Sequence, residues 1–112
     1  MPLGQVRAAL ESAGMGSACA AALGDYLDLV RRWNPAYNLV ASGDIERLET
    51  RHLLDSLALV PEVGAGPLLD IGSGAGFPGL PVAIATGVET VLLERSRKRA
   101  RFLTQVKLEL AL

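Results

Sequence analysis

The fold of this chain is decided by the stretch Leu68-Leu69-Asp70-Ile71-Gly72-Ser73-Gly74-Ala75-Gly76-Phe77. A short, mainly apolar run leads into a turn with glycine at every second position, and an apolar segment follows up to about Ala85. This order predicts a buried strand, a tight loop and then a helix. Glycine permits a positive φ and lacks a Cβ atom, so a ligand can lie against the loop backbone beside the free N–H groups of the helix start. We therefore expect a ligand-binding loop over residues 72–76.

The residues after this loop repeat the order of strand and helix. Pro78 suits the first turn of a helix, and Gly87 is expected to end that helix. A second short strand is predicted over Val91–Glu94. An amphipathic helix is predicted over residues 97–110, with one side formed by Ala100, Leu103, Val106, Lys107 and Leu110. Alternating strands and helices imply parallel strands joined by right-handed crossovers, so the fold class is α/β.

The residues before Leu68 are predicted to be helical. Helices are expected over residues 2–13, 17–34 and about 45–60; Pro35 should stop the second, and Ser42-Gly43-Asp44 should begin the third. The second helix carries an apolar stripe that we expect in the core: Ala22, Leu23, Tyr26, Val30 and Trp33. Pro61 and the cluster Gly64-Ala65-Gly66-Pro67 then close the helical part. We expect two parts, a helical extension over residues 1–66 and the first half of an α/β domain over residues 67–112.

Length and composition indicate one small globular unit. The chain has 112 residues, of which 50% are hydrophobic and 21% charged, and this excludes a disordered chain. The single Cys19 excludes an internal disulfide and favours a reduced, buried thiol in an intracellular protein. No apolar run is long enough to cross a bilayer and no secretion signal is recognisable, so we expect a cytoplasmic protein with no membrane as partner. We also expect no metal. Two strands cannot bury both faces of a parallel sheet, which indicates that the sequence is cut short.

Charge is distributed unevenly along the chain. Residues 1–90 hold five Arg and ten Asp or Glu, whereas residues 91–112 hold six Arg or Lys and only two Glu. Five of the seven residues in Arg95-Ser96-Arg97-Lys98-Arg99-Ala100-Arg101 are basic. Such a run is typical of a phosphate-binding surface, although a solvated helix face is the alternative interpretation.

The glycine loop carries the candidate chemistry. It lies at the carboxyl end of the first strand, where ligands bind in open α/β sheets. The dinucleotide pattern G-x-G-x-x-G is not met, because Phe77 stands where its third glycine would be. Glu94 follows Gly74 by twenty residues, at the end of the second strand, where a carboxylate can accept hydrogen bonds from both hydroxyls of a ribose. No phosphate-binding lysine accompanies the glycines, so a nucleoside without phosphates, such as S-adenosylmethionine, fits the pattern.

The residues of this pattern that are expected to bind the cofactor are Asp70, Gly72, Ser73, Gly74, Gly76 and Glu94. A tight turn without a ligand is the alternative interpretation of the glycines taken alone.

Three separated motifs carry a resemblance to a known family. They are Asn34-Pro35-Ala36-Tyr37-Asn38-Leu39, Arg51-His52-Leu53-Leu54-Asp55-Ser56-Leu57 and the stretch from Leu69 to Pro81. In this order they closely resemble the bacterial guanine-N7 methyltransferases of 16S ribosomal RNA, also called glucose-inhibited division protein B. The resemblance runs from about Asn34 to Leu110, and family members are about twice as long.

The resemblance implies a Rossmann-like, S-adenosylmethionine-dependent methyltransferase with an N-terminal helical extension. Its substrate would be a guanine in 16S ribosomal RNA or the small ribosomal subunit. Gly72 and Phe77 would contact the cofactor, and Glu94 would hold its ribose. The resemblance also favours RNA contacts by the start of the basic helix, at Arg97, Lys98, Arg99 and Arg101.

Guanine N7 already offers a lone pair, so its methylation needs no general base, and positioning would supply most of the catalysis. His52, Asp55 and Ser56 share a helix face and are expected to form a hydrogen-bonded group beside the cofactor loop. A network that only docks the helical part onto the sheet is the alternative, and Asn38 has the same two interpretations. Trp33 could stack on a base, but its position in the apolar stripe favours the core.

Two other functions compete with the enzyme. The first is a non-catalytic fragment that binds S-adenosylmethionine and RNA but lacks the pocket for the methyl acceptor. The second is a half-domain of a dinucleotide-dependent dehydrogenase, which Phe77 disfavours.

Overall fold

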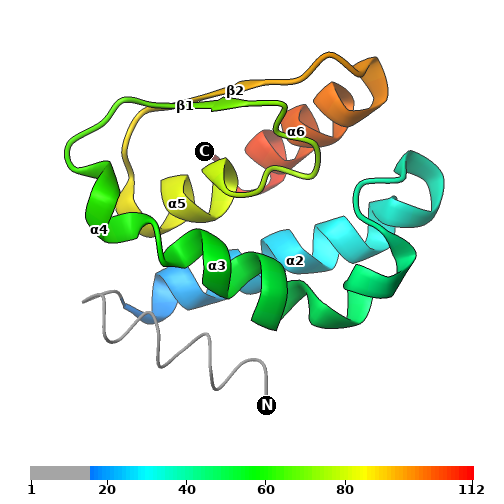
Figure 1. Cartoon of the computed structure of the whole chain (residues 1–112), viewed down its shortest axis with the longest axis horizontal. Helices are drawn as coiled ribbons and strands as arrows, with labels where there is room; N and C mark the ends of the chain where they lie inside the picture. Colours follow the sequence, from blue (N-terminus) through cyan, green and yellow to red (C-terminus); the bar gives the residue numbers. More distant parts are fainter. Residues whose placement is uncertain (1–15) are drawn as a thin grey trace.

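The computed structural model describes residues 16–112, and the helix predicted over residues 2–13 lies outside them. A two-stranded parallel sheet lies over helices α5 and α6, which in turn pack against helix α2 (Figure 1). Helix α3 also packs against α5. The protein is therefore an α/β structure with a small parallel sheet, as the sequence predicts.

Helix α2 spans Ser17–Tyr37 and buries one face. Leu23, Tyr26 and Val30 are fully buried, and Trp33 packs against the same core, with its ring 6.1 Å from that of Phe102. The prediction that Trp33 belongs to the core is confirmed.

The prediction that Pro35 stops this helix is wrong. Proline lacks an N–H group, but in the last turn of α2 this removes only one helical hydrogen bond. The helix instead ends at Tyr37 and is capped by Asn38, which has a left-handed φ of 52° and donates its N–H to the Asn34 carbonyl oxygen at 2.8 Å. Asn34 Oδ1 accepts hydrogen bonds from the N–H groups of Leu39 and Val40, both at 2.8 Å.

The segment predicted as one helix over residues 45–60 consists of four short helical pieces. They are the 3-10 helix η1 (Ser42–Arg47), the π-helix η2 (Leu48–Leu53), α3 (Leu54–Leu57) and α4 (Val60–Val63). The helical segment therefore begins at Ser42, not after it, and Asp44 donates its N–H to the Ala41 carbonyl at 2.9 Å. The changes in helical spacing bring Leu48, Leu53 and Leu57 into one core.

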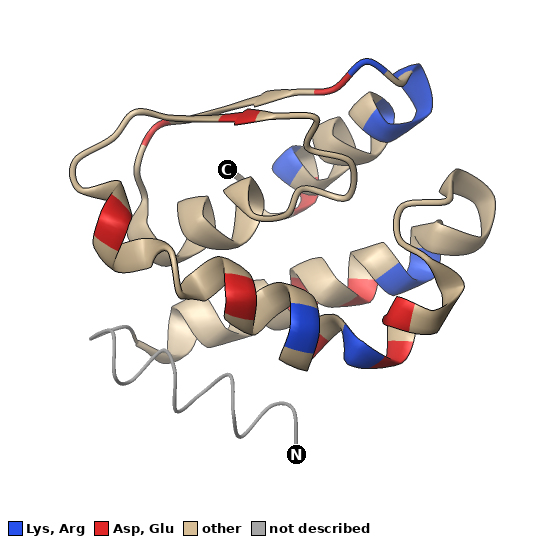
Figure 2. Cartoon of the chain, viewed as in Figure 1, with Lys and Arg blue, Asp and Glu red and all other residues tan. Residues whose placement is uncertain are grey.

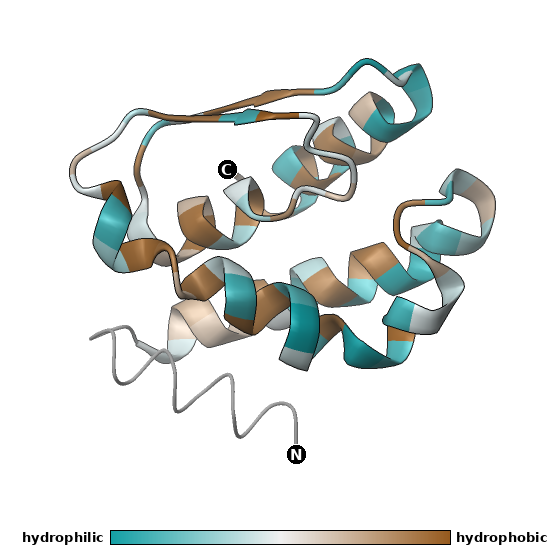
Figure 3. Ribbon diagram, in the orientation of Figure 1, coloured by the Kyte–Doolittle hydropathy of each residue, from teal (hydrophilic) through white to brown (hydrophobic). Residues whose placement is uncertain are grey.

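The sheet contains β1 (Leu68–Ile71) and β2 (Thr90–Leu93), with Leu68 opposite Thr90 and Ile71 opposite Leu93. β2 thus begins and ends one residue earlier than predicted, and Glu94 follows it directly. The inner face of the sheet packs on α5 (Gly79–Thr86), which ends at Gly87 as predicted. The outer face of the sheet carries Leu69, Ile71, Val91 and Leu93, which are all exposed, Ile71 to 75%. The ribbon of both strands is mainly brown, the colour of hydrophobic residues (Figure 3). In the described residues only one face of the sheet is covered.

Helix α6 spans Arg97–Glu109 and buries Phe102, Leu103 and Val106. Its buried side is rotated from the predicted one, because Lys107 is exposed and Phe102 lies inside. The reason is the aromatic ring of Phe102, which packs against the ring of Trp33 on α2.

Cys19 is only half-buried, with its Sγ 3.6 Å from the Ile84 carbonyl oxygen. Among the helices of residues 16–112, none combines the length and apolar character needed to cross a membrane.

The packing of α6 predicts a strong contrast between two leucines of the same helix. Leu103→Ala removes a side chain that is 9% exposed, so we expect it to lower the free energy of unfolding by about 2–5 kcal/mol. Leu108→Ala removes one that is 71% exposed and should change it by less than about 0.5 kcal/mol. Urea denaturation followed by circular dichroism measures both. Equal losses would show that α6 packs through a different face.

Candidate functional site

The glycine loop continues the backbone pairing of the two strands. Gly72 and Ser73 donate their N–H groups to the Leu93 carbonyl oxygen at 2.8 and 3.1 Å. Gly72 and Gly74 have positive φ values of 73° and 58°, and a Cβ atom on either would meet nothing within 4 Å. The outer side of the loop is therefore open at these two glycines, which leaves room for a ligand against the backbone.

Glu94 connects the glycine loop to the end of β2. Its Oε1 accepts a hydrogen bond from the Gly74 N–H at 2.7 Å, and its Oε2 accepts one from the Ser96 N–H at 2.8 Å. The backbone N–H groups of Ser96 and Gly74 lower the pKa of Glu94 below its usual 4.5, and the charge of Arg99 adds to this. A carboxylate has about four acceptor positions. Each oxygen of Glu94 therefore keeps a lone pair that a ligand hydroxyl could use.

Asp70 lies on the inner side of the loop. Its Oδ2 accepts a hydrogen bond from the Gly79 N–H at 3.1 Å, at the start of α5, where the helix dipole favours a negative charge. Burial raises the pKa of Asp70 above its usual 3.8, against the lowering effect of the hydrogen bond from the Gly79 N–H. Ser73 is buried and donates its hydroxyl to the Asp70 carbonyl oxygen at 3.1 Å. Both side chains thus hold the loop and the helix together.

Phe77 lies between two other rings. Its ring centroid is 5.5 Å from that of Tyr26 and 5.1 Å from that of His52. The Nε2 of His52 lies 3.3 Å from Asp44 Oδ2 but makes no hydrogen bond within the described residues. His52 therefore lies next to the candidate loop and contacts it through the ring of Phe77.

The other members of the predicted polar group make no hydrogen bond to the His52 side chain within the described residues. Ser56 is buried, and its hydroxyl donates to the backbone carbonyl of His52 at 2.7 Å. Asp55 is exposed. Asn38 is also exposed and lies at the end of α2, so the structure brings only His52 of these four residues to the glycine loop.

The four predicted RNA-binding residues fall into two pairs. Lys98 Nζ donates to the Ala36 carbonyl at 3.1 Å, and a guanidinium N–H of Arg99 donates to the Asn38 carbonyl at 3.1 Å. These cations stabilise the last carbonyls of α2. Arg97 and Arg101 are exposed, and within residues 16–112 no hydrogen bond or ion pair holds their side chains. Figure 2 shows this concentration of positive charge at the start of α6.

Tyr26 is a residue of the site that sequence reasoning missed. The apolar stripe of α2 assigned it to the core, which is where it lies, fully buried. Its hydroxyl, however, donates a hydrogen bond to the Ala75 carbonyl in the glycine loop at 2.7 Å. Burial, and to a lesser extent the charge of Asp70, raise the pKa of Tyr26 well above its usual range. The signal that could have identified it is a hydroxyl in an otherwise apolar stripe, because a buried hydroxyl needs a partner.

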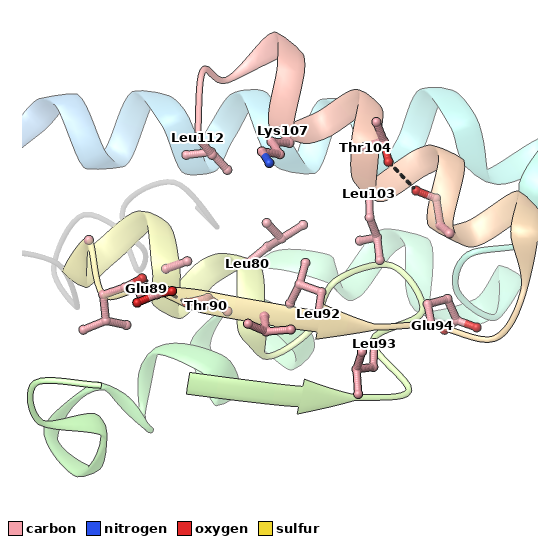
Figure 4. Close-up of a pocket in the computed structure, with 15 residues that line it drawn as sticks. Leu80, Glu89, Thr90, Leu92, Leu93, Glu94, Leu103, Thr104, Lys107 and Leu112 are labelled. Atoms are coloured by element: carbon pink, nitrogen blue, oxygen red, sulfur yellow. Dashed lines mark hydrogen bonds between the residues drawn. The ribbon is translucent and has the colours of Figure 1, made fainter. Parts of the chain in front are cut away.

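A separate cavity of about 730 Å³ lies between β2 and the helices α5 and α6 (Figure 4). Its wall includes Leu80, Leu92, Leu103 and, at one end, Glu94. None of the residues from Gly72 to Gly76 lines it. The cavity therefore shares Glu94, but not the glycine loop, with the candidate site, and it is a mainly apolar space along the edge of β2.

The two hydrogen bonds of Glu94 predict a pH-dependent contribution to stability. Because the pKa of Glu94 is lowered in the folded chain, the stabilisation is present above about pH 4.5 and is lost as the pH falls through the lower, folded value. Glu94→Gln should therefore be less stable than the unsubstituted chain by about 1 kcal/mol at neutral pH, a modest value because the carboxylate is solvated. The difference should shrink in acid, since both chains then carry a neutral side chain.

Urea denaturation at neutral pH and at about pH 3 measures this difference. Glu89→Gln, at the other end of β2 and exposed, is the matched control and should show no such difference at either pH. A pH-independent loss for Glu94→Gln would contradict the assignment.

Comparison with known proteins identifies the family. The family model described as "GidB: rRNA small subunit methyltransferase G" matches residues 20–112. Two similar proteins are named ribosomal RNA small subunit methyltransferase G. The one from Stenotrophomonas maltophilia is 47% identical over 92% of this chain and 49% of its own length. The one from Alkalilimnicola ehrlichii is 52% identical over 83% of this chain and 43% of its own length. The relative in Pseudomonas aeruginosa is 53% identical over 78% of this chain and 42% of its own length.

The chain spans about half the length of the curated relatives it matches. The match includes the glycine loop, Glu94 and the basic start of α6, which all fall within residues 20–112. On this similarity, the chain belongs to the rRNA small subunit methyltransferase G family.

Proposed function

We propose that this chain carries the cofactor-binding part of an S-adenosylmethionine-dependent methyltransferase that modifies N7 of a guanine in 16S ribosomal RNA. The observation that carries the proposal is the geometry of Glu94, which follows β2 directly and holds the glycine loop through Gly74. We also propose that the whole enzyme is cytoplasmic and acts on ribosomal RNA or the small ribosomal subunit; the names of the relatives support the ribosomal RNA substrate.

The residues present fit an adenosyl cofactor. The loop backbone is open above Gly72 and Gly74, and Glu94 keeps unused lone pairs on both oxygens for the two ribose hydroxyls. Phe77 offers a half-buried ring beside the loop. The cofactor-binding set that we propose remains Asp70, Gly72, Ser73, Gly74, Gly76, Phe77 and Glu94, with Asp70, Ser73 and Gly76 acting through the shape of the loop.

S-adenosylmethionine, when bound, supplies an electrophilic methyl group on a sulfonium. This chain's own residues bind and orient: Glu94 fixes the ribose, and the backbone at Gly72 and Gly74 allows close approach. Guanine N7 carries no proton that must be removed, so His52 is not needed as a base, and we assign it to the packing of Phe77. Catalysis would come from holding the reacting atoms in line, which is where effective molarity is gained.

We propose that residues 67–112 form the first half of a Rossmann-like domain and that residues 1–66 form its helical extension. The parallel pairing of β1 and β2, with α5 connecting them, supports this arrangement. The parts are not independent, because α2 packs against both α5 and α6.

Arg97 and Arg101 are the strongest candidates for RNA contact because their side chains are exposed at the start of α6, directly after Glu94. Lys98 and Arg99 stay in the proposed surface, but they also hold the end of α2. A phosphate backbone passing this surface would lie close to the cofactor loop, as transfer of a methyl group to RNA requires.

A second candidate is a non-catalytic fragment that binds the cofactor and RNA without transferring the methyl group. It would need only the glycine loop with Glu94 and the exposed cations Arg97 and Arg101, which the described residues contain. Transfer of tritium from labelled S-adenosylmethionine into 16S ribosomal RNA distinguishes the two, because only the enzyme incorporates label.

Cofactor binding tests the proposal directly. We expect S-adenosylhomocysteine to bind the chain in isothermal titration calorimetry, and Glu94→Ala to weaken it by roughly 10–100-fold, because the variant removes two hydrogen bonds to a charged group. Glu89→Ala should bind as the unsubstituted chain does. Binding of NAD without binding of S-adenosylhomocysteine would refute the methyltransferase assignment.

RNA binding should depend more on one pair of cations than on the other. Replacing Arg97 and Arg101 together by Ala should make the dependence of log K on log salt shallower by about two, about one for each phosphate that is no longer neutralised. Replacing Lys98 and Arg99 should change the slope less and mainly lower thermal stability. Fluorescence anisotropy with a 16S ribosomal RNA fragment at several salt concentrations measures both slopes. An unchanged slope for the Arg97 and Arg101 variant would remove them from the interface.

A further inference from the structure

The glycine loop rests on helix α2 at one residue. The Tyr26 hydroxyl donates a hydrogen bond of 2.7 Å to the carbonyl oxygen of Ala75, which lies 49 positions later in the chain. Tyr26 is fully buried and Ala75 is 4% exposed, so water does not compete for this carbonyl. The hydrogen bond therefore joins the helical part of the protein to the centre of the loop.

Neighbouring residues of the loop also touch Tyr26. A Cβ atom on Gly76 would lie 3.0 Å from the Tyr26 hydroxyl oxygen and would collide with Leu80. The ring of Phe77 lies 5.5 Å from the ring of Tyr26. Three consecutive residues, Ala75 and Gly76 of the loop and Phe77 directly after it, thus lie against one side chain of α2.

The peptide unit between Ala75 and Gly76 is held at both ends. Its carbonyl accepts from Tyr26, and its N–H donates to the Ser73 carbonyl at 2.7 Å. Gly76 has a φ of 103°, and glycines on both sides of Ala75 allow several loop conformations of similar energy. The loop sequence alone does not select one of them. The Tyr26 hydroxyl does, because any other orientation of this peptide leaves a buried carbonyl or hydroxyl without a partner.

We propose that Tyr26 is a positioning residue for the cofactor loop: by holding the Ala75 carbonyl, it keeps the Gly74 N–H against Glu94 and the loop open for an adenosyl ligand. The proposal rests on the proposed function and deepens it, because it makes helix α2 part of the cofactor site. It also gives the helical extension a role besides packing. The ligand contacts the loop, and Tyr26 acts on the ligand only through the loop.

Tyr26→Phe tests the proposal, since it removes the hydroxyl and keeps the ring. Tyr37→Phe is the matched control: it makes the same chemical change in the same helix, but its ring packs on Trp33 and not on the loop. In isothermal titration calorimetry at a temperature well below both melting points, Tyr26→Phe should bind S-adenosylhomocysteine about tenfold more weakly than the unsubstituted chain. Tyr37→Phe should differ by less than about twofold.

Amide hydrogen exchange gives a second measurement that needs no ligand. The Gly76 N–H should exchange about tenfold faster in Tyr26→Phe, whereas the amides of α6 should keep their rates relative to global unfolding. A lower melting temperature with unchanged affinity and unchanged Gly76 exchange would overturn the proposal, because Tyr26 would then only pack. Faster Gly76 exchange in Tyr26→Phe, in a chain that does not bind S-adenosylhomocysteine, would support the role in the loop and reject the cofactor.

Discussion

The carboxylate of Glu94 is the interaction on which the arrangement of this site depends. One oxygen holds the N–H of Gly74 and the other holds the N–H of Ser96. A single side chain therefore joins the loop after the first strand, the end of the second strand and the start of α6. The two strands alone share a short pairing of four residues each, so this contact extends their alignment to the point where a ligand would bind.

The two acidic residues of the site differ because their surroundings differ. Burial raises the pKa of Asp70, whose side chain turns inward to the first N–H of α5. Backbone N–H groups lower the pKa of Glu94, which lies at the open side of the loop. Asp70 thus stabilises the helix that follows the loop, while Glu94 stays ionised and available to hydroxyl donors. The same residue class stabilises the scaffold in one position and, under the proposed function, would bind the ribose in the other.

The sequence predicted those features that depend on local pattern. A short, mainly apolar run and the three glycines that follow it located β1, the loop and α5, and Gly87 ended α5 as expected. The prediction that Pro35 ends the helix was wrong because a proline in the last turn destabilises a helix little. Asn34 and Asn38 then provide hydrogen bonds for the backbone that follows the helix. The pieces of residues 42–63 could not be predicted, since their hydrogen-bond spacing follows from packing Leu48 and Leu53 into a distant core. The partners of several side chains also depend on long-range contacts that the sequence does not show. Lys98 and Arg99 donate hydrogen bonds to carbonyls at the end of α2, and Tyr26 donates one to the loop.

The most direct test of the role of Glu94 and its loop is to map where an adenosyl ligand contacts the chain. Amide chemical shifts of the ¹⁵N-labelled chain, recorded while S-adenosylhomocysteine is added, report this residue by residue. We predict the largest changes at residues 72–76 and 94–96, on the two sides of the Glu94 carboxylate, and small ones along the edge of β2. Changes confined to the apolar cavity between β2, α5 and α6, with the glycine loop unaffected, would contradict this.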